Sequence, residues 1–550
     1  MNGALLLVAG IALYAVAYRF YGGFLERKLV KPNDEVQTPA YSRRDGTDYC
    51  PAKSPVLFGH HFSSIAGAGP ILGPVIGVFH FGWAAVSLWV IMGSIFIGAV
   101  HDYLSLMVSV RSEGESMAEA AKNTIGNGAR VAFSVFVYAG LVLVITAFGN
   151  AAAKTLIARG ELVIPTFGLI FVAMVAGFMI YKTKLPLWAS TVVALGLVVL
   201  CIVLGGLKPL PLQNEEGALK IWFTVLIAYG GIASLLPVWF LLQPRDYLSS
   251  YFLFAGIGLG CLGVFVTHPV LAWPAWRSFQ SQQGPLWPMM GVIVACGAIS
   301  GFHSLVAGGT TSKQLDKETE GKKIGYGSML VEGALALIVV VAVAGGLSQL
   351  EFKEAFSVGW IEAYGQGFAA LIAKLGIPEK LGSLFAILVV NAFVLTTLDT
   401  SVRICRFVVQ ESFGDYVNPL RNKYAATALA IGPALLLGLT NKLGDIWPVF
   451  GSANQLIAAL ALIVISCYLV GVKRPATYTL IPAIIMLLTT LAALGYKGWT
   501  FFHPEEGDPK RLLASICLAL MLLAIYVAVS AGQALSRLKR DGSRGVGVQG

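Results

Sequence analysis

Charged residues are scarce in this chain. Lys, Arg, Asp and Glu together make up only 12% of its 550 residues, whereas soluble domains carry about 25%. Hydrophobic residues make up 56% of the chain. So many apolar side chains cannot all be buried inside a water-soluble globule. The composition therefore excludes an ordinary soluble protein and predicts a membrane protein.

Paired cysteines and enzyme signatures are also missing. The seven cysteines are scattered, with no CxxC or CxxCH spacing, so a disulfide framework or a cysteine metal site is not expected. GxSxG, HExxH and GxxxxGK[ST] do not occur, which disfavours an enzyme. ATP-driven transport would need another subunit, and no ATPase subunit is evident. No cofactor is predicted.

Long hydrophobic runs are what the sequence does contain. They are roughly 18–25 residues long, the length that a helix needs to cross the hydrocarbon core of a bilayer. We therefore predict an all-α polytopic membrane protein, in contact with membrane lipid, with about 15 transmembrane helices. The predicted spans are 3–19, 59–79, 82–101, 130–150, 162–181, 187–206, 219–242, 250–268, 286–311, 325–347, 383–402, 424–441, 448–471, 475–496 and 511–533.

The distribution of basic residues predicts the topology. The net charge is +10, which could indicate nucleic acid, an anionic surface or membrane orientation. Lys and Arg gather in alternate loops and in the tail, as the positive-inside rule requires, so no nucleic acid is expected. The clusters include Arg27, Lys28, Arg43, Arg44, Lys313, Lys317, Lys322, Lys323, Arg537, Lys539 and Arg540. We expect a multi-pass protein of the bacterial cytoplasmic membrane, N-terminus outside and C-terminus inside.

Two spans contain enough helix breakers to be interrupted. Gly and Pro crowd the span at 59–79, and Tyr229, Gly230 and Gly231 followed by Ser234 and Pro237 mark the span at 219–242. Their opposite directions, five helices apart, match a five-plus-five inverted repeat of the LeuT kind. We predict an additional leading helix and loop (1–58), a transporter core (59–411), peripheral helices (412–533) and a basic, disordered tail (534–550). Segments 113–127 and 348–382 are expected to lie on the membrane surface.

Unwound backbone inside a bilayer is tolerated only where it lines a cavity or is packed in protein, so the breaks indicate the transport pathway. Free N–H groups there suit a carboxylate and free carbonyls suit a cation. A histidine here could titrate, or could simply be satisfied by backbone; a zinc site is disfavoured because adjacent histidines diverge by about 100°. The candidate substrate-binding residues are His60, His61, Ser63, Ser64, Gly67, Gly69, Tyr229, Gly230, Gly231 and Ser234.

The ninth span repeats the composition of the second and ends in hydroxyl residues. In the proposed core it is the eighth helix, which in LeuT-like carriers clasps a sodium ion against the first; a basic residue could replace that ion. Asp399 could couple an ion or pair with nearby Arg403 or Arg406. The candidate ion-coupling residues, for H⁺ or Na⁺, are Ala66, Ser304, Thr310, Thr311, Ser312 and Asp399.

Three further polar groups are interpreted from their place in the spans. Arg245 and Asp246 follow the seventh span, where we expect them to form a gate held by their mutual contact. His101, Asp102 and Glu332 fall near predicted span ends, so we expect them at the membrane interface.

Five motifs together resemble the carbon starvation protein A (CstA) family: 59–71 (GHHFSSIAGAGPI), 236–239 (LPVW), 243–248 (QPRDYL), 396–400 (TTLDT) and 447–455 (WPVFGSANQ). The resemblance implies a bacterial transporter that imports peptides under carbon starvation, or pyruvate in some members, by alternating access driven by an ion gradient. The substrate would be a peptide or a small carboxylate. The alternatives left open are a channel, which broken helices disfavour, and a membrane nutrient sensor.

Overall fold

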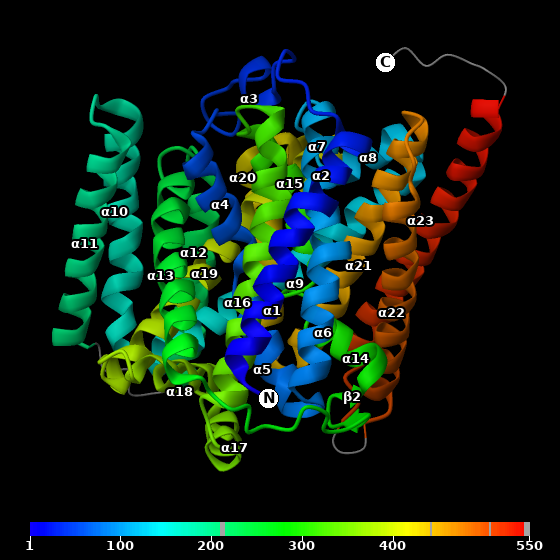
Figure 1. Cartoon of the computed structure of the whole chain (residues 1–550). Helices are drawn as coiled ribbons and strands as arrows, with labels where there is room; N and C mark the ends of the chain where they lie inside the picture. Colours follow the sequence, from blue (N-terminus) through cyan, green and yellow to red (C-terminus); the bar gives the residue numbers. More distant parts are fainter. Residues whose placement is uncertain (210–214, 441–442, 505–507, 544–550) are drawn as a thin grey trace.

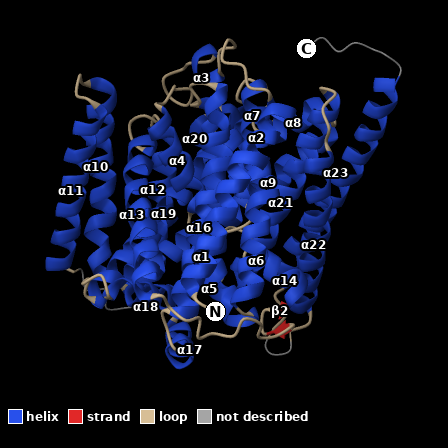
Figure 2. Cartoon of the chain, viewed as in Figure 1, coloured by secondary structure: helices blue, strands red, loops and turns tan. Residues whose placement is uncertain are grey.

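A bundle of near-parallel helices makes up almost the whole of the computed structural model (Figures 1 and 2). The structure describes residues 1–209, 215–440, 443–504 and 508–543. A two-stranded antiparallel sheet, β1 (Gln280–Ser281) with β2 (Gly284–Pro285), lies in a loop at one end of the bundle. The fold class predicted from the sequence, an all-α membrane bundle, is confirmed.

Within the described residues, fourteen helices are long and apolar enough to cross a membrane. A further pair of short helices, described below, brings the number to the predicted fifteen. The first half of the chain contains α1 (Gly3–Val16), α2 (Gly23–Leu25), α3 (Pro39–Ser42), α4 (Ser54–Ala66), α5 (Gly69–Phe81), α6 (Trp83–Gly93), α7 (Ala99–Arg111), α8 (Met117–Thr124), α9 (Asn127–Ala158), α10 (Val163–Lys182), α11 (Leu187–Leu207), α12 (Glu215–Leu235) and α13 (Leu242–Thr267). The second half contains α14 (Leu286–Ile293), α15 (Gly301–Gly309), α16 (Ser328–Gly345), α17 (Gln349–Val358), α18 (Trp360–Ala373), α19 (Glu379–Val408), α20 (Lys423–Thr440), α21 (Leu443–Gly471), α22 (Thr477–Phe502) and α23 (Arg511–Ser543).

The break predicted in the second span is present. α4 ends at Ala66, and α5 begins after two intervening residues at Gly69, with Pro70 in its first turn. Gly67 between them has φ +46° and ψ −157°, a conformation that is open essentially to glycine alone. A Cβ atom on Gly67 would also lie 2.8 Å from the Thr397 hydroxyl. The helix therefore unwinds at a position that only glycine can occupy.

The second predicted break is wrong. α12 is helical through Tyr229, Gly230 and Gly231, and the chain turns only after Leu235. The two glycines serve close packing instead: a Cβ on Gly230 would meet Val402 of α19 at 3.2 Å, and one on Gly231 would meet Ile431 of α20 at 3.1 Å. Paired glycines can mark a tight helix contact as well as a break.

The second interrupted helix is the ninth span, formed by α14 and α15 with a non-helical stretch at 294–300 between them. Its break packs directly on the first. A Cβ on Gly69 would overlap Cys296, and one on Gly73 would lie 2.7 Å from the Ile293 carbonyl. The expectation that this span is the eighth core helix is therefore wrong; we assign it as the sixth.

The helices that surround the first break and those that surround the second make equivalent contacts. α4 packs on α13 and α15 packs on α21; α12 packs on α19 and α20 packs on α9. The long helices α9 and α19 pack on each other. Surface helix α8 precedes α9, and the surface pair α17–α18 precedes α19. Two such equivalent sets give the five-plus-five inverted repeat of a LeuT-like core.

This arrangement changes the assignment of the core. We infer that the core consists of α4–α5, α6–α7, α9, α12, α13, α14–α15, α16, α19, α20 and α21, so that it extends past residue 411. The α10–α11 hairpin is then an insertion, at the edge of the bundle in Figure 1. Leading helix α1 and the final pair α22–α23 lie outside the repeat. α23 is helical to Ser543, beyond the predicted start of the tail at 534, and the tail's last residues, 544–550, lie outside the described part.

The two ends of the bundle are distinguishable. α1 begins at the lower end in Figure 1, and α23 ends at the upper end, where α3 also lies. We call the upper end the α3 face and the lower end the amino-terminal face. α8 lies at the α3 face, whereas α17 and α18 lie at the amino-terminal face. The predicted surface segments 113–127 and 348–382 form these helices.

Candidate functional site

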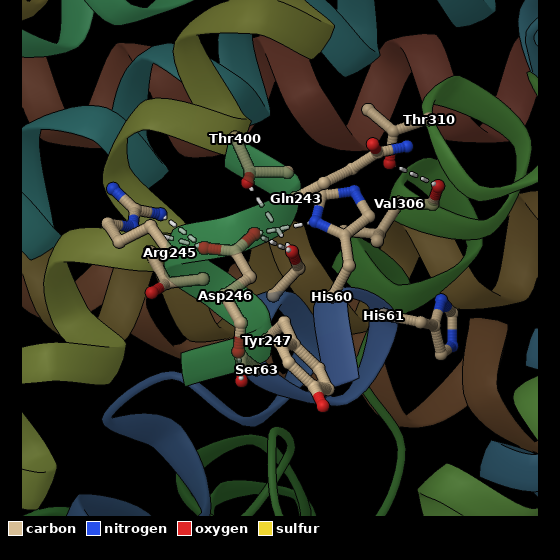
Figure 3. A network of polar contacts seen from close by, with 12 residues as sticks. His60, His61, Ser63, Gln243, Arg245, Asp246, Tyr247, Val306, Thr310 and Thr400 are labelled. Atoms are coloured by element: carbon tan, nitrogen blue, oxygen red, sulfur yellow. Dashed lines mark hydrogen bonds and ion pairs between the residues drawn. The ribbon is translucent and has the colours of Figure 1, made fainter. Parts of the chain in front are cut away.

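The two adjacent histidines of α4 point into different polar surroundings. Figure 3 shows the His60 ring directed toward Asp246 and the His61 ring directed away from it. Both side chains are fully buried. Successive residues on a helix differ by about 100° in direction, so neighbouring imidazoles cannot share one ligand geometry. The pair therefore connects α4 to two separate polar clusters.

Asp246, on α13, is the hub of the first cluster. Its Oδ2 lies 2.6 Å from His60 Nδ1, and it accepts a hydrogen bond from Ser64 Oγ at 3.3 Å. Ser63 Oγ donates to the backbone carbonyl of Asp246 at 2.8 Å. Three of the predicted α4 side chains thus converge on Asp246, two of them on its carboxylate and one on its backbone carbonyl, and Figure 3 shows this arrangement. The conjunction of α4 with α13 was not predicted.

Arg245 joins this hub to α19. Its guanidinium donates to Asp246 Oδ1 from Nη2 at 2.5 Å, and it also pairs with both carboxylate oxygens of Asp399, through Nη2 to Oδ1 at 2.9 Å. Tyr229 donates to Asp399 Oδ2 at 2.8 Å and accepts from Arg245 Nη1 at 2.8 Å. The predicted contact between Arg245 and Asp246 is present, but it lies inside the bundle, and Asp399 pairs with Arg245 rather than with Arg403 or Arg406.

The electrostatics of this network follow from its burial. The side chains of Arg245, Asp246 and Asp399 are all 0% exposed. A lone buried guanidinium is prohibitively costly, so its pairing with carboxylates is obligatory. One positive charge faces two carboxylates, and the Asp246 carboxylate also contacts the His60 imidazole.

A chain of amides extends the network toward the α3 face. Gln314 Nε2 lies 3.3 Å from His60 Nε2 and donates to the Thr310 carbonyl at 3.1 Å. Gln243 donates to Gln314 Oε1 at 2.6 Å. Gln243 belongs to the 243–248 motif but was given no role of its own, and Gln314 was not singled out, because an amide carries no signal until its neighbours are known.

Arg245 lies beside the contact between α4 and α19. In the observed fold the first and eighth core helices are α4 and α19, which meet through Ser64 Oγ and Thr400 Oγ1 at 3.4 Å and through Thr397 Oγ1 and the Ser64 carbonyl at 3.3 Å. Ala66 ends α4 at this point and is buried. The Arg245 guanidinium contacts Asp399 of α19 directly and reaches α4 through Asp246. A positively charged side chain of the protein therefore lies at this helix contact.

The predicted hydroxyl ligands of the ninth span do not gather around this point. Ser304, Thr310 and Ser312 each donate to a carbonyl of their own helix, at 2.7, 3.1 and 2.9 Å. Thr311 reaches α4, but its partner is His61 Nδ1 at 2.8 Å. The expectation of a hydroxyl cage against α4 fails because this span is the sixth core helix, not the eighth.

Asn454 caps the broken end of α15. Its Oδ1 accepts the Phe302 N–H at 2.8 Å, while its Nδ2 donates to Ser300 Oγ at 3.0 Å. A helix N-terminus favours an anion, and here an amide oxygen occupies that position. Asn454 belongs to the 447–455 motif, but its position at this helix end could not be predicted from the motif alone.

Aromatic rings separate the breaks from a cavity. Phe148, Trp447 and Phe450 pack edge to face, with centroid distances of 6.1, 5.6 and 5.1 Å, and a Cβ on Gly67 would lie 3.3 Å from the Phe148 ring. The cavity, about 400 Å³, opens toward the amino-terminal face. Its walls are Leu72, Ile76, Lys154, Thr155, Ala158, Arg159, Gln283, Val358, Gly359, Trp360, Ile361, Glu362, Ile387 and Trp447.

Ion pairs bind the helices together at the α3 face. Asp48, in the first loop, lies 2.5 Å from Arg403 Nη1 and 3.3 Å from Arg406 Nη2, and Arg130 Nη2 lies 2.9 Å from Asp415. Burial acts to raise the pKa of Asp48, but the two guanidinium groups outweigh it and hold that pKa below its usual value. The first loop is thus tied to α19.

The remaining predicted site residues do not enter the network. Ser234 donates to the Gly231 carbonyl at 2.8 Å and lies near Thr427 of α20, while Gly230 and Gly231 pack α12 against its neighbours. Gly69 is buried at the contact between the two breaks. Within the described residues no group of three His, Cys, Asp or Glu is arranged to hold a metal ion.

An inverted repeat with two broken helices, a buried charge network between them and a cavity at one face defines a membrane transporter of LeuT-like fold. A crystal structure of the Eremococcus coleocola manganese transporter superposes with a TM-score of 0.51 at 13% identity, over 89% of this chain and 99% of that one. At this identity the likeness concerns the fold alone.

Sequence comparison places the chain in a family. The model described as "Carbon starvation protein CstA" matches residues 2–356 and 349–493. The peptide transporter CstA of Bacillus subtilis is 31% identical over 99% of this chain and 98% of its own length. In Escherichia coli, the peptide transporter CstA is 32% identical and the pyruvate/proton symporter BtsT is 31% identical, each covered over 82% of its length. The chain belongs to the carbon starvation protein CstA family.

Proposed function

We propose that this protein is a secondary active transporter that imports peptides by alternating access, driven by a proton gradient. The observation that carries the proposal is the buried Arg245 guanidinium, held by Asp246 and Asp399 beside the break at Gly67. A fixed cation there takes the place of a bound sodium ion, which leaves the proton as driver. The relative named as a pyruvate/proton symporter supports the same choice.

We assign the carboxylate of the substrate to the two helix breaks. α5 and α15 both begin there, and the N-terminus of a helix carries partial positive charge. Asn454 Oδ1 already accepts the Phe302 N–H at the start of α15, so an incoming carboxylate oxygen has an equivalent position to occupy. Phe148, Trp447 and Phe450 then separate this position from the cavity.

Peptides are favoured over pyruvate by the charges in the cavity. Lys154, Arg159 and Glu362 all line it, and Arg159 Nη2 lies 3.3 Å from Glu362. Both signs of charge suit a zwitterion with an amino and a carboxyl terminus, whereas pyruvate needs only a cation. The relatives named as peptide transporters agree. Pyruvate, or a similar small carboxylate, stays the second candidate because of the named symporter.

The direction of transport follows from the proposed orientation. The basic first loop and α23 end at the α3 face, which the positive-inside rule assigns to the cytoplasm. The cavity then opens to the outside, while ion pairs of Arg130, Arg403 and Arg406 close the cytoplasmic side. This asymmetry corresponds to an outward-facing state with its central site covered.

The test is uptake by proteoliposomes that contain the purified protein. Labelled dialanine and labelled pyruvate are supplied separately, under an imposed proton gradient or an imposed sodium gradient. We expect dialanine to accumulate with the proton gradient and to leave when the gradient is collapsed. Accumulation of pyruvate alone would favour the second candidate. Absence of uptake of both by inserted, folded protein would contradict transport of these substrates and favour a nutrient sensor.

A further inference from the structure

Two more carboxylates lie inside the bundle, outside the Arg245 network. Asp102 belongs to α7 and Glu332 to α16, and both side chains are 0% exposed. The sequence-based expectation that they lie at membrane interfaces is wrong. A carboxylate buried in a transmembrane bundle is costly and calls for an explanation.

Their partners are imidazoles. His61 Nε2 lies 3.1 Å from Asp102 Oδ2, and His303 Nε2 lies 3.4 Å from Glu332 Oε2. The His101 ring is 6.2 Å from that of His303, centre to centre. Three histidines and two carboxylates from α4, α7, α15 and α16 therefore form one buried cluster, which we call the histidine–carboxylate cluster.

Several atoms in this cluster lack hydrogen-bond partners. Asp102 Oδ1, both carboxylate oxygens of Glu332 and both ring nitrogens of His101 and of His303 have none, although all these side chains are fully buried. In the described part of the chain, no Lys or Arg forms an ion pair with Asp102 or Glu332. The other ionisable groups that face the cluster are Cys296, between α14 and α15, and Tyr14, which packs on α16 at Gly333.

Electroneutrality then requires protons. Without a fixed cation, two ionised carboxylates would leave uncompensated negative charge in the membrane, at a cost of several kcal/mol each. One proton in each pair, on the carboxyl group or on the imidazole beside it, removes that charge. The Arg245 network has a guanidinium for this purpose, whereas the histidine–carboxylate cluster has only groups that gain or lose a proton.

We infer that the histidine–carboxylate cluster is the binding site of the coupling proton. This inference rests on the proposed function, since it names the residues through which the proton gradient would act. His61 lies on α4 and His303 on α15, the halves of the two broken helices nearer the α3 face. Their partners lie on α7 and α16. Protonated pairs therefore hold both mobile halves against the rest of the bundle.

Release of the protons weakens the contacts of α4 and α15 with α7 and α16. When a proton leaves each pair toward the α3 face, an ionised carboxylate and a neutral imidazole stay behind, and Asp102 and Glu332 repel each other. Separation of α4 and α15 from α7 and α16 admits water, which solvates both carboxylates and opens the α3 face. Proton transfer and helix movement are then one event, as coupling requires.

The transport test uses Glu332→Gln and Asp102→Asn, which keep size and hydrogen-bonding capacity but cannot give up a proton. We expect each to lose accumulation driven by the proton gradient at least tenfold while retaining exchange of labelled for unlabelled substrate. Glu354→Gln on the exposed surface of α17 is the matched control and should keep both activities. Gradient-driven accumulation at the wild-type level in Glu332→Gln and Asp102→Asn would overturn the inference.

A second readout does not depend on transport. The infrared carbonyl stretch of protonated carboxyl groups is measured at neutral pH for wild type, Glu332→Gln and Glu354→Gln. We expect the wild-type band to weaken in Glu332→Gln only. If the wild-type protein failed to take up any substrate, the proposed function would be contradicted. The infrared band would still show whether Glu332 carries a proton. A band unchanged by Glu332→Gln would contradict the inference.

Discussion

Arg245 of α13 and Asp399 of α19 form a fully buried, two-point ion pair. The pair joins the fifth and eighth core helices immediately beside the break in the first. Tyr229 of α12 and Asp246 complete its surroundings. The position of the Arg245 guanidinium is therefore set by side chains from three helices, α12, α13 and α19.

The first prediction concerns the cost of separating this pair. Arg245→Gln leaves Asp246 and Asp399 as buried charges with too few partners, so the free energy of unfolding should fall by about 3–5 kcal/mol. The double variant Arg245→Gln/Asp399→Asn should lose less than Arg245→Gln alone. Thermal unfolding in detergent measures both. Additive losses in the double variant would show that the two side chains do not interact.

A second prediction concerns the break in the first core helix. Gly67→Ala places a Cβ 2.8 Å from the Thr397 hydroxyl, in a conformation that costs about 1–3 kcal/mol for other residues. We expect transport to fall at least tenfold, because the α4–α5 junction must shift. Gly196→Ala in α11 is the control, since nothing lies within 4 Å of its new methyl group; it should transport normally. Normal activity of Gly67→Ala would disprove the role given to the break.

The third prediction concerns the pH dependence of the ion pairs of Asp48. Its pKa is lowered in the folded protein, so its contribution to stability is complete above the unfolded pKa of about 3.9 and is lost as pH falls through the lower, folded value. Asp48→Asn should therefore be less stable than wild type by about 1–3 kcal/mol from pH 5 to pH 8. That difference should shrink below about pH 4. Thermal unfolding at several pH values measures it, and a difference that grew in acid would contradict the assignment.

A fourth prediction separates the two substrate classes. Glu362→Gln removes the negative charge from the cavity and frees Arg159. We expect the KM for dialanine to rise severalfold while the KM for any pyruvate uptake stays the same or falls. Glu354→Gln, on a neighbouring exposed surface, is again the control. Equal effects on both substrates would show that Glu362 does not recognise the amino terminus of a peptide.

The sequence predicted the class of fold well because its signal is local. Hydrophobic length identifies a span, and the crowd of Gly and Pro at 59–79 marks a break that the backbone at Gly67 confirms. Gly230 and Gly231 were misread because glycine also permits close helix contact. Because that break was assigned to the wrong span, the ninth span was numbered as the eighth core helix instead of the sixth. Its hydroxyl residues were therefore assigned to ion binding.

The polar network was predicted only in part, because its contacts join distant segments. His60, Ser63, Ser64, Tyr229, Arg245, Asp246 and Asp399 were all singled out and do meet. Their pairing was not foreseen, since Asp399 has Arg403 and Arg406 nearby in sequence but Arg245 in space. Gln243 was noted only as part of the 243–248 motif and Gln314 not at all. The burial of Asp102 and Glu332 could not be predicted from their places near span ends.

The most direct test of the account is proton movement evoked by substrate. Proteoliposomes enclosing a pH-sensitive dye are suspended in sodium-free buffer, and dialanine is added outside. The account predicts acidification of the interior that needs both dialanine and the protein, and that is absent in the Glu332→Gln variant. Entry of dialanine without proton movement, or entry that requires sodium, would contradict it.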